Sequence, residues 1–460
     1  MARPNFLFIL IDVLGWRDLA CTGSTFYETP NLNRLAAAGM SFTDAYAACP
    51  VCSPTRASIL TGKYPARLSL TNWIGGHETG RLISAPYIDH LPLTERTIAR
   101  ALRDVGYRTY HVGKWHLGEQ PYWPEQHGFD VNIGGCDWGA PRYGYFSPYH
   151  CPTLADGPQG EYLTNRQTDE AIRLIEDNGS QPFFMYLSHY AVHIPIQAPL
   201  DLVDKYIDKA SALGLDRQPT FALGESFPCD HKRHLRVIRR LLQSDPAYAA
   251  MVECLDAGIG RVLQALEDTG QASNTVVFLT SDNGGLATSE GSPTCNAPLS
   301  EGKGWMYEGG TREPLIVRWP DHIAPGSTCS VPVTSTDFYP TLLEMAGLEL
   351  DPDQHRDGVS LLPLLRGADE IERGAIYWHY PHYGNQGGTP GSSIRAGDLK
   401  LIEFFESGTN ELYNLRDDIS ERQNLARDLP QVTAEMADEL ACWREQVQAR
   451  LPAPNPDYRP

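Results

Sequence analysis

A cysteine and an arginine begin a short stretch, VCSPTRASILTGKYPARL, whose residue types could bind an anion and react with it. Ser53 suits an N-cap, Pro54 suits the first helical turn and Gly62 suits a C-terminal stop, so the pattern predicts a short helix that ends at Gly62. Cys52 would lie at the N-terminus of this helix, where free N–H groups and the helix dipole attract anions, and Arg56 adds a positive charge. The alternative is a buried cysteine before an ordinary helix.

Other polar side chains follow apolar runs that have the pattern of buried parallel strands. The runs cover residues 5–11, 107–112, 182–187 and 274–280. In an open parallel sheet, ligands bind beyond the C-terminal ends of the strands. We therefore expect one site to contain the side chains that follow these runs: Asp12, Lys114, His116, His193, Asp282 and Asn283.

Three of these side chains offer oxygen atoms that suit a hard cation. Asp12, Asp282 and Asn283 would supply carboxylate and amide oxygens from two strand ends. A single aspartate in such a place more often makes a turn or caps a helix. The combination favours a metal site.

Helical patterns alternate with the apolar runs and occupy residues 93–105, 161–177, 248–269 and 337–346. This alternation predicts an α/β fold with a large, mainly parallel central sheet flanked by helices. From about Gly374, short strand-like pieces and a final helix predict a smaller C-terminal α+β domain with a short antiparallel sheet. We expect a catalytic domain over residues 1–370 and a C-terminal subdomain over residues 371–460.

Composition excludes several classes of partner. A formal net charge of −19 argues against nucleic acid or an acidic membrane surface. The ten cysteines follow no pattern and predict mostly free thiols. No stretch approaches the length of a membrane span, and the apolar N-terminal run lacks a cleavage site. We expect a cytoplasmic protein, or a periplasmic or secreted one whose export signal has been removed.

Several motifs resemble one known family. The segment CSPTRASILTG matches C-x-P-x-R followed by L-T-G, and GKWHLG, SDNGG, EGKGWMYEGGTREP and NELYNLRDDISERQNLA match further blocks of the same family. The chain is identified on these residues as a member of the type I (formylglycine-dependent) sulfatases, in the alkaline-phosphatase-like superfamily. The resemblance covers residues 5–426.

The resemblance implies a modified nucleophile and a metal ion. Cys52 would be oxidised to formylglycine by the formylglycine-generating enzyme, and one Ca²⁺ would be bound by Asp12, Asp282, Asn283 and the modified Cys52. The family's second aspartate in D-D-x-G is Val13 here, so one expected ligand is missing.

The resemblance also implies roles for the charged side chains. Arg56, Lys114 and Lys303 would bind the sulfate oxygens, and a hydroxyl of the hydrated formylglycine would attack sulfur. His193 would protonate the leaving alcohol, with His189 as a weaker rival, and His116 would assist the release of sulfate.

Aromatic and polar residues in loops are candidates for the leaving-group pocket, because such side chains suit a sugar ring. They are Trp73, Asp137, Trp138, Arg142, Tyr143, Tyr145, His379, His382 and Asn385. The predicted function is exo-acting hydrolysis of a carbohydrate sulfate ester, such as a sulfate of galactose or N-acetylgalactosamine. The alternatives are a phosphonate monoester or phosphodiester hydrolase of the same superfamily, and a catalytically silent glycan-binding relative.

Overall fold

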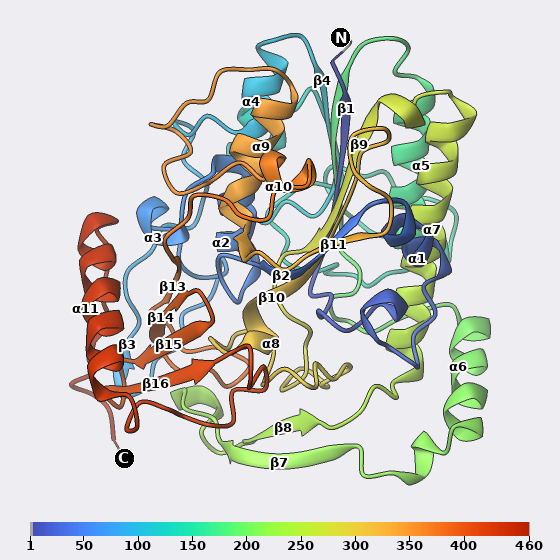
Figure 1. The fold of residues 1–460 in the computed structure, drawn as a ribbon. Helices are drawn as coiled ribbons and strands as arrows, with labels where there is room; N and C mark the ends of the chain where they lie inside the picture. Colours follow the sequence, from blue (N-terminus) through green and yellow to red (C-terminus); the bar gives the residue numbers. More distant parts are fainter. Residues whose placement is uncertain (1–2, 460) are drawn as a thin grey trace.

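The computed structural model describes residues 3–459, and a nine-stranded mixed sheet forms its centre (Figure 1). The strand order is β11-β2-β10-β9-β1-β6-β4-β5, with β12 also paired to β2. Only β10 runs antiparallel to its neighbours in this sheet, which confirms the predicted mainly parallel arrangement. The strands are β1 (Asn5–Ile11), β2 (Met40–Tyr46), β4 (Arg108–Gly113), β5 (Val131–Ile133), β6 (Phe183–His189), β9 (Thr275–Ser281), β10 (Arg312–Arg318), β11 (Ser327–Cys329) and β12 (Val333–Thr334).

Helices cover both faces of this sheet, which explains why its central strands are apolar throughout. Along β1, residues 7, 9 and 11 pack into one hydrophobic core, and residues 6, 8 and 10 pack into another. The first core lies under α1 (Pro30–Ala38), α5 (Leu163–Glu176) and α7 (Pro246–Asp268). The second lies under α2 (Cys52–Thr61), α4 (Ile98–Arg103), α9 (Phe338–Met345) and α10 (Leu362–Leu365).

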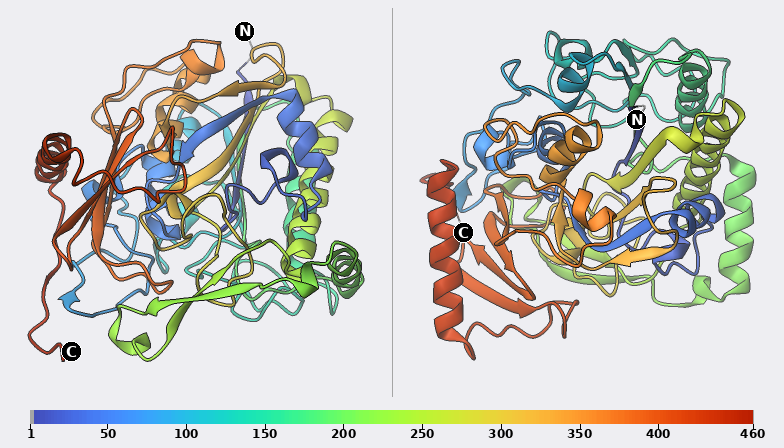
Figure 2. Two further views of the ribbon diagram at one scale, coloured as in Figure 1. Left: turned by 60° about the horizontal axis from the view of Figure 1, so that its bottom comes forward. Right: turned by 45° about the horizontal axis from the view of Figure 1, so that its top comes forward.

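A four-stranded antiparallel sheet follows near the C-terminus, in the order β13-β14-β15-β16. Its strands are β13 (Ile376–Tyr380), β14 (Gly391–Ala396), β15 (Leu399–Phe404) and β16 (Thr409–Asn414). The terminal helix α11 (Pro430–Gln446) covers its outer face, where Leu440 and Trp443 pack against Ile394 and Leu401 (Figure 2). This confirms the expected small sheet, and the boundary at residue 370 stays a prediction.

The remaining elements are short or lie at the edge of the molecule. Helix α6 (Leu200–Ala212) leads to the hairpin of β7 (Phe221–Ser226) and β8 (Arg236–Arg240). The others are α3 (Pro65–Leu68), α8 (Glu308–Thr311) and the pair β3 (Leu82–Ile83) and β17 (Ala453–Pro454). Within residues 3–459, no helix combines the length and hydropathy that a bilayer span requires.

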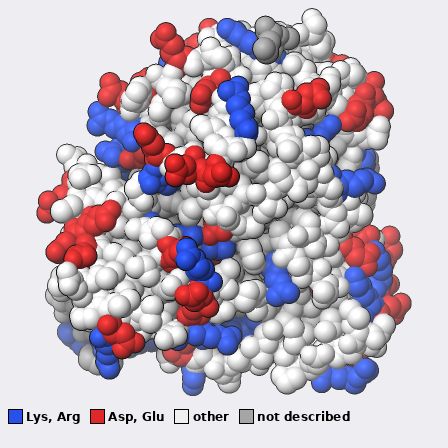
Figure 3. Space-filling view, in the orientation of Figure 1, with Lys and Arg blue, Asp and Glu red and all other residues white. Residues whose placement is uncertain are grey.

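Surface charge agrees with the composition. On the face that Figure 3 shows, Lys and Arg side chains are interspersed with Asp and Glu. A nucleic-acid surface would gather basic side chains along one face or groove.

Two helix termini differ from their predictions. Helix α2 ends as expected at Gly62, whose φ of 69° places it in the left-handed region. The prediction that Ser53 caps this helix is wrong, because the helix begins at Cys52, and the Ser53 hydroxyl instead accepts a hydrogen bond from the Ile74 N–H at 3.2 Å. Helix α4 is shorter than expected because Thr97 caps it by accepting a hydrogen bond from the Arg100 N–H.

Buried ion pairs join the two sheets. Lys400 of β15 donates to Glu308 at 2.8 Å and to Glu421 at 2.9 Å, and all three side chains are buried. Glu308 also accepts hydrogen bonds from Arg312 of β10 and Tyr46 of β2, each at 2.7 Å. Because buried charges are stable only when they are paired, this network fixes the small sheet against the large one.

We expect Lys400→Met to destabilise the protein strongly, because it leaves Glu308 and Glu421 buried beside each other without this cation. Breaking a buried pair costs about 3–5 kcal/mol. Lys205→Met is the matched control, since Lys205 also makes two ion pairs at 2.7 Å but is 39% exposed. Such surface pairs contribute about 0–1 kcal/mol. Equal falls of the two calorimetric unfolding midpoints would contradict this role of Lys400.

Candidate functional site

The strand ends bring the predicted polar side chains together at one edge of the central sheet. Asp12 follows β1, Lys114 follows β4, His193 lies shortly after β6 and Asp282 follows β9. These strands are neighbours and run parallel, so their carboxyl ends meet. Helix α2 places Cys52, its first residue, against the same edge.

Four charged side chains form the base of the site, and each is at most 1% exposed. Lys114 Nζ donates to Asp12 Oδ2 at 2.7 Å, and Arg56 Nε donates to Asp282 Oδ2 at 2.8 Å. Arg56 Nη1 also donates to the Lys114 carbonyl at 2.9 Å and to the Ser188 hydroxyl at 2.6 Å. Arg56 therefore ties the ends of β4, β6 and β9 into one charged cluster.

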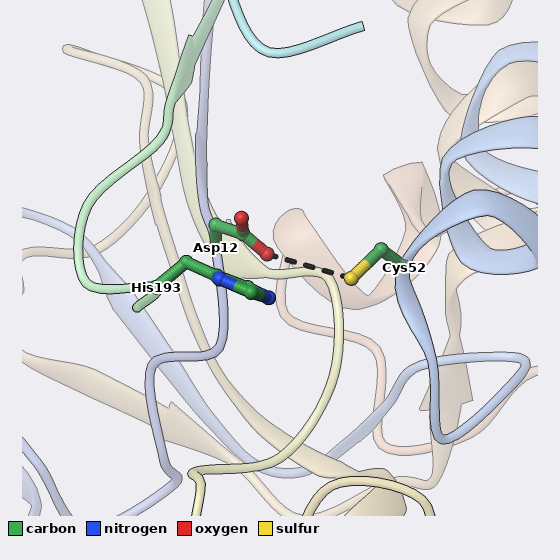
Figure 4. Close-up of side chains that lie close together, drawn as sticks. All are labelled: Asp12, Cys52 and His193. Carbon is green, nitrogen blue, oxygen red and sulfur yellow. Dashed lines mark hydrogen bonds between the residues drawn. The ribbon is translucent and has the colours of Figure 1, made fainter. Parts of the chain in front are cut away.

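Cys52 points into this cluster and toward Asp12 and His193 (Figure 4). Its Sγ lies 3.6 Å from Asp12 Oδ1. Burial raises the pKa of the Cys52 thiol to about 11, although Lys114 and Lys303 act in the opposite direction. The thiol is therefore protonated at neutral pH and is a poor nucleophile.

His193 forms a pair with Lys303 beside Cys52. Lys303 Nζ lies 2.7 Å from His193 Nε2, and His193 Nδ1 lies 3.1 Å from the Ile194 carbonyl. These partners assign the proton to Nδ1 and make Nε2 the acceptor. Burial, Lys303 and Lys114 hold the pKa of His193 well below its usual value. One proton donor thus lies at this side of the site.

His189, the rival candidate, lies elsewhere. It is fully buried, and its Nδ1 lies 3.3 Å from Gln167 Oε1. Burial lowers the pKa of His189 to about 4. Among the described residues, Cys52 and His193 line one cavity, and His189 does not.

His116 approaches the site from the loop after β4. Its Nε2 lies 3.3 Å from the Ile74 carbonyl, and among residues 3–459 its Nδ1 has no hydrogen-bond partner although it is buried. Burial, with Lys114 and Arg56 nearby, holds the pKa of His116 well below its usual value. His116 is therefore a neutral imidazole with one ring nitrogen left free for a ligand.

The oxygen atoms at the strand ends fit a divalent cation. Asn283 Oδ1 is buried and has no partner in the described chain. Burial and the neighbouring Asp12 raise the pKa of Asp282, so a cation between the two carboxylates would relieve their repulsion. One ligand atom each of Asp12, Cys52 and His193 also lie within 4.8 Å of one another. The carboxylate and amide oxygens of Asp12, Asp282 and Asn283 suit a hard cation better than a soft one.

Val13 supplies no side-chain ligand at this site. It is fully buried, and its φ of 58° is unusual for a β-branched residue. Its N–H donates to Asp282 Oδ1 at 3.1 Å. The backbone of Val13 thus orients one carboxylate, while its side chain offers no oxygen to a cation.

A cavity of about 290 Å³ opens above these groups. Of the predicted residues, it brings together Cys52, Trp73, His116, Asp137, Arg142, His193, Lys303 and Asn385. Arg142 donates to Asp137 at 2.6 Å and lies over the Trp138 ring, 5.3 Å from its centroid. The space is at the small end for a ligand pocket and suits a single ring.

Other predicted pocket residues lie outside this cavity, which corrects the expectation. His379 is buried between the Ser392 hydroxyl at 2.7 Å and the Arg450 carbonyl at 2.9 Å. His382 is fully buried, with Nε2 2.8 Å from the Thr71 hydroxyl. The others are Tyr143, which is 62% exposed and packs on His150, and two buried aromatics, Trp138 and Tyr145.

Further residues line this cavity that the sequence did not indicate. They include Ile74, Gly139, Glu290 and Gln386. Glu290 is a single acid in a loop, and Gln386 is the residue after the predicted Asn385. Neither belongs to a motif. Spacing alone carries no signal for them, because they reach the cavity only through tertiary packing.

Comparisons with known proteins agree with this geometry. The sulfatase family model matches residues 4–348, and a model for the C-terminal part of N-sulphoglucosamine sulphohydrolase matches residues 301–446. A sulfatase of Formosa agariphila is 33% identical, over 96% of this chain and 88% of that protein. N-acetylgalactosamine-6-sulfatase of Mus musculus is 32% identical, over 82% of this chain and 68% of that protein.

Solved structures show the same likeness. The crystal structure of Ps i-CgsB superposes with a TM-score of 0.77 at 27% identity, and the match covers 96% of this chain and 93% of that one. Enzymes of this kind use formylglycine and a divalent metal, and the buried Cys52 beside a cluster of carboxylates and cations has the groups for both. The chain belongs to the sulfatase family and is a sulfuric ester hydrolase.

Proposed function

We propose that this sulfatase hydrolyses a sulfate ester of a carbohydrate, with formylglycine at Cys52 and one Ca²⁺. Two similar proteins support the substrate class: one is named N-acetylgalactosamine-6-sulfatase, and Ps i-CgsB is also known in complex with k-i-k-neocarrahexaose. The cavity of about 290 Å³ suits one sugar ring. The formylglycine-generating enzyme would act on the chain before it is active.

The observation that carries the proposal is the state of Cys52. A thiol with a pKa of about 11 is inert at neutral pH, yet it lies beside Asp12 and close to the cations Lys114 and Lys303. Such a place serves an anion and an oxygen nucleophile better than a thiol. Formylglycine would supply a hydrated aldehyde hydroxyl as nucleophile, and the cation held by Asp12, Asp282 and Asn283 would supply Lewis acidity.

The remaining residues bind the sulfate and move protons. Lys114 and Lys303 lie close enough to Cys52 to act on its charge and would balance the charge of the sulfate oxygens, while Arg56 connects the strand ends of the cluster. Lys303 holds a proton against His193 Nε2 on the leaving-group side, and this proton would pass from Lys303 through Nε2 to the departing oxygen. His116, neutral with a free Nδ1, would accept a proton as sulfate is released.

Coexpression with the formylglycine-generating enzyme should convert Cys52. We expect mass spectrometry of the peptide that holds Cys52 to show an aldehyde in place of the thiol, and Cys52→Ala to abolish hydrolysis of 4-nitrophenyl sulfate. Cys49→Ala is the control, because Cys49 is buried outside the cavity. An unmodified Cys52 would favour the silent glycan-binding alternative, and faster cleavage of an aryl phosphonate than of the aryl sulfate would favour the phosphonate hydrolase.

His193→Ala should affect substrates according to their leaving groups. An alcohol leaves poorly without a proton, so we expect kcat/KM for a sugar sulfate to fall by about 10²–10⁴-fold. The loss for 4-nitrophenyl sulfate should be much smaller, because 4-nitrophenolate is a stable anion. His189→Ala, which removes a buried histidine outside the cavity, should change both substrates alike. If His193→Ala lowered kcat/KM equally for the sugar sulfate and for 4-nitrophenyl sulfate, this role of His193 would be contradicted.

Val13→Asp should strengthen the cation site. A carboxylate there would lie next to Asp12 and Asp282, and aspartate tolerates the left-handed backbone better than valine does. We expect added Ca²⁺ to raise the calorimetric unfolding midpoint of Val13→Asp more than that of the parent, since tenfold tighter binding adds about 1.4 kcal/mol at high Ca²⁺. Val13→Gly controls for the backbone, because glycine adopts positive φ readily and supplies no oxygen. Equal Ca²⁺ shifts in Val13→Asp and Val13→Gly would argue against a metal at this place.

A further inference from the structure

One wall of the active-site cavity carries a carboxylate and two amides that the proposed chemistry does not use. Glu290 comes from the loop after β9, and Asn385 and Gln386 come from the loop between β13 and β14. Glu290 Oε1 accepts a hydrogen bond from Asn385 Nδ2 at 3.1 Å and from Gln386 Nε2 at 3.3 Å. Two loops that are distant in sequence therefore hold one oxygen of this carboxylate in place.

The other oxygen of Glu290 is free to bind a ligand. Among residues 3–459, Glu290 Oε2 is buried without a hydrogen-bond partner, and the same is true of Gln386 Oε1 and Trp73 Nε1. All three residues line the cavity. Buried polar atoms without partners are rare and costly, so this wall is suited to a ligand with hydroxyl groups.

The backbone turns through three consecutive residues with positive φ at Glu290. Glu290, Gly291 and Ser292 have φ values of 54°, 88° and 43°, all in the left-handed region. Ser292 anchors the turn: its N–H donates to the Ser289 carbonyl at 2.8 Å, and its hydroxyl donates to the Ile238 carbonyl at 2.9 Å. Strained backbone of this kind persists where the surroundings hold it, often at binding sites.

The cavity wall carries charges of both signs. Lys303 and Glu290 line it together with Asp137 and Arg142, and Lys303 Nζ lies 2.7 Å from His193 Nε2. Asp137 is paired with Arg142 at 2.6 Å, whereas both hydrogen-bond partners of Glu290 are neutral amides. Among residues 3–459 no cation forms a salt bridge with Glu290, so this carboxylate keeps an oxygen available to a ligand.

We propose that Glu290, held by Asn385 and Gln386, is a specificity-determining residue that accepts a hydrogen bond from a hydroxyl of the sugar ring that carries the sulfate. This inference rests on the carbohydrate substrate proposed above. A buried acceptor without a donor disfavours any leaving group that lacks this hydroxyl. Its charge also disfavours a ring with a carboxylate or a second sulfate at that position.

The test compares sugar and aryl substrates in one variant. Galactose 6-sulfate, N-acetylgalactosamine 6-sulfate and N-acetylgalactosamine 4,6-disulfate serve as sugar probes, and 4-nitrophenyl sulfate serves as the aryl probe. In Glu290→Gln, we expect kcat/KM for the preferred monosulfate to fall about 10- to 100-fold further than kcat/KM for the aryl sulfate. In the same variant, the ratio of kcat/KM for the monosulfate to kcat/KM for the disulfate should fall. Glu225→Gln, which alters an exposed glutamate of β7 outside the cavity, should leave these ratios unchanged.

Deoxy analogues of the preferred sugar sulfate make the test independent of any folding defect. A substrate without the hydroxyl that binds Glu290 should have a lower kcat/KM than the full sugar in the parent enzyme. In Glu290→Gln, the two substrates should have similar kcat/KM values. The role of Glu290 would be overturned if Glu290→Gln lowered kcat/KM equally for sugar and aryl sulfates. It would also be overturned if removal of the hydroxyl lowered kcat/KM as much in Glu290→Gln as in the parent. Turnover of the aryl sulfate with no turnover of any sugar probe would instead overturn the carbohydrate proposal, and this inference with it.

Discussion

Charge balance in a dry site is the constraint on which this structure depends. Asp12, Arg56, Lys114 and Asp282 are almost fully excluded from water, and removing any one would leave another unpaired. Such a cluster needs positions fixed to a fraction of an ångström, which loops alone do not give. The ends of β1, β4 and β9 provide them, because ladder hydrogen bonds and helices on both faces hold these strands.

The same cluster gives a physical reason why the proposed chemistry would begin with a modified residue. Burial suppresses ionisation of the Cys52 thiol, so the environment that binds an anion well also silences a sulfur nucleophile. An oxygen nucleophile beside a hard cation suits that environment better. Val13 would offer one oxygen fewer to the proposed cation than an aspartate would, while its N–H orients Asp282.

The fold and the base of the site could be predicted from the sequence, because both rest on local patterns. Apolar runs that end in Asp12, Lys114 or Asp282 show strand and site together, and the motif around Cys52 adds the helix. The outer pocket could not be predicted this way. His379 and His382 look like ligand-binding residues in sequence, but both are buried and bonded to protein groups. His379 bonds a residue more than ten positions away in the chain, and His382 bonds one more than three hundred positions away, so the sequence gives no sign of either contact. Glu290 stands in no motif, and its place in the cavity wall depends on the approach of the β13–β14 loop.

The buried bridge between the two sheets has a consequence for how such an enzyme can change. Glu290 and the groups proposed to bind sulfate belong to segments that follow strands of the large sheet, whereas Asn385 and Gln386, which hold Glu290, belong to a loop of the small sheet. Lys400 with Glu308 fixes one sheet against the other, so the proposed substrate preference depends on both sheets and on the buried bridge between them. Variation in the β13–β14 loop would change how Glu290 is held without altering the residues at the base of the site.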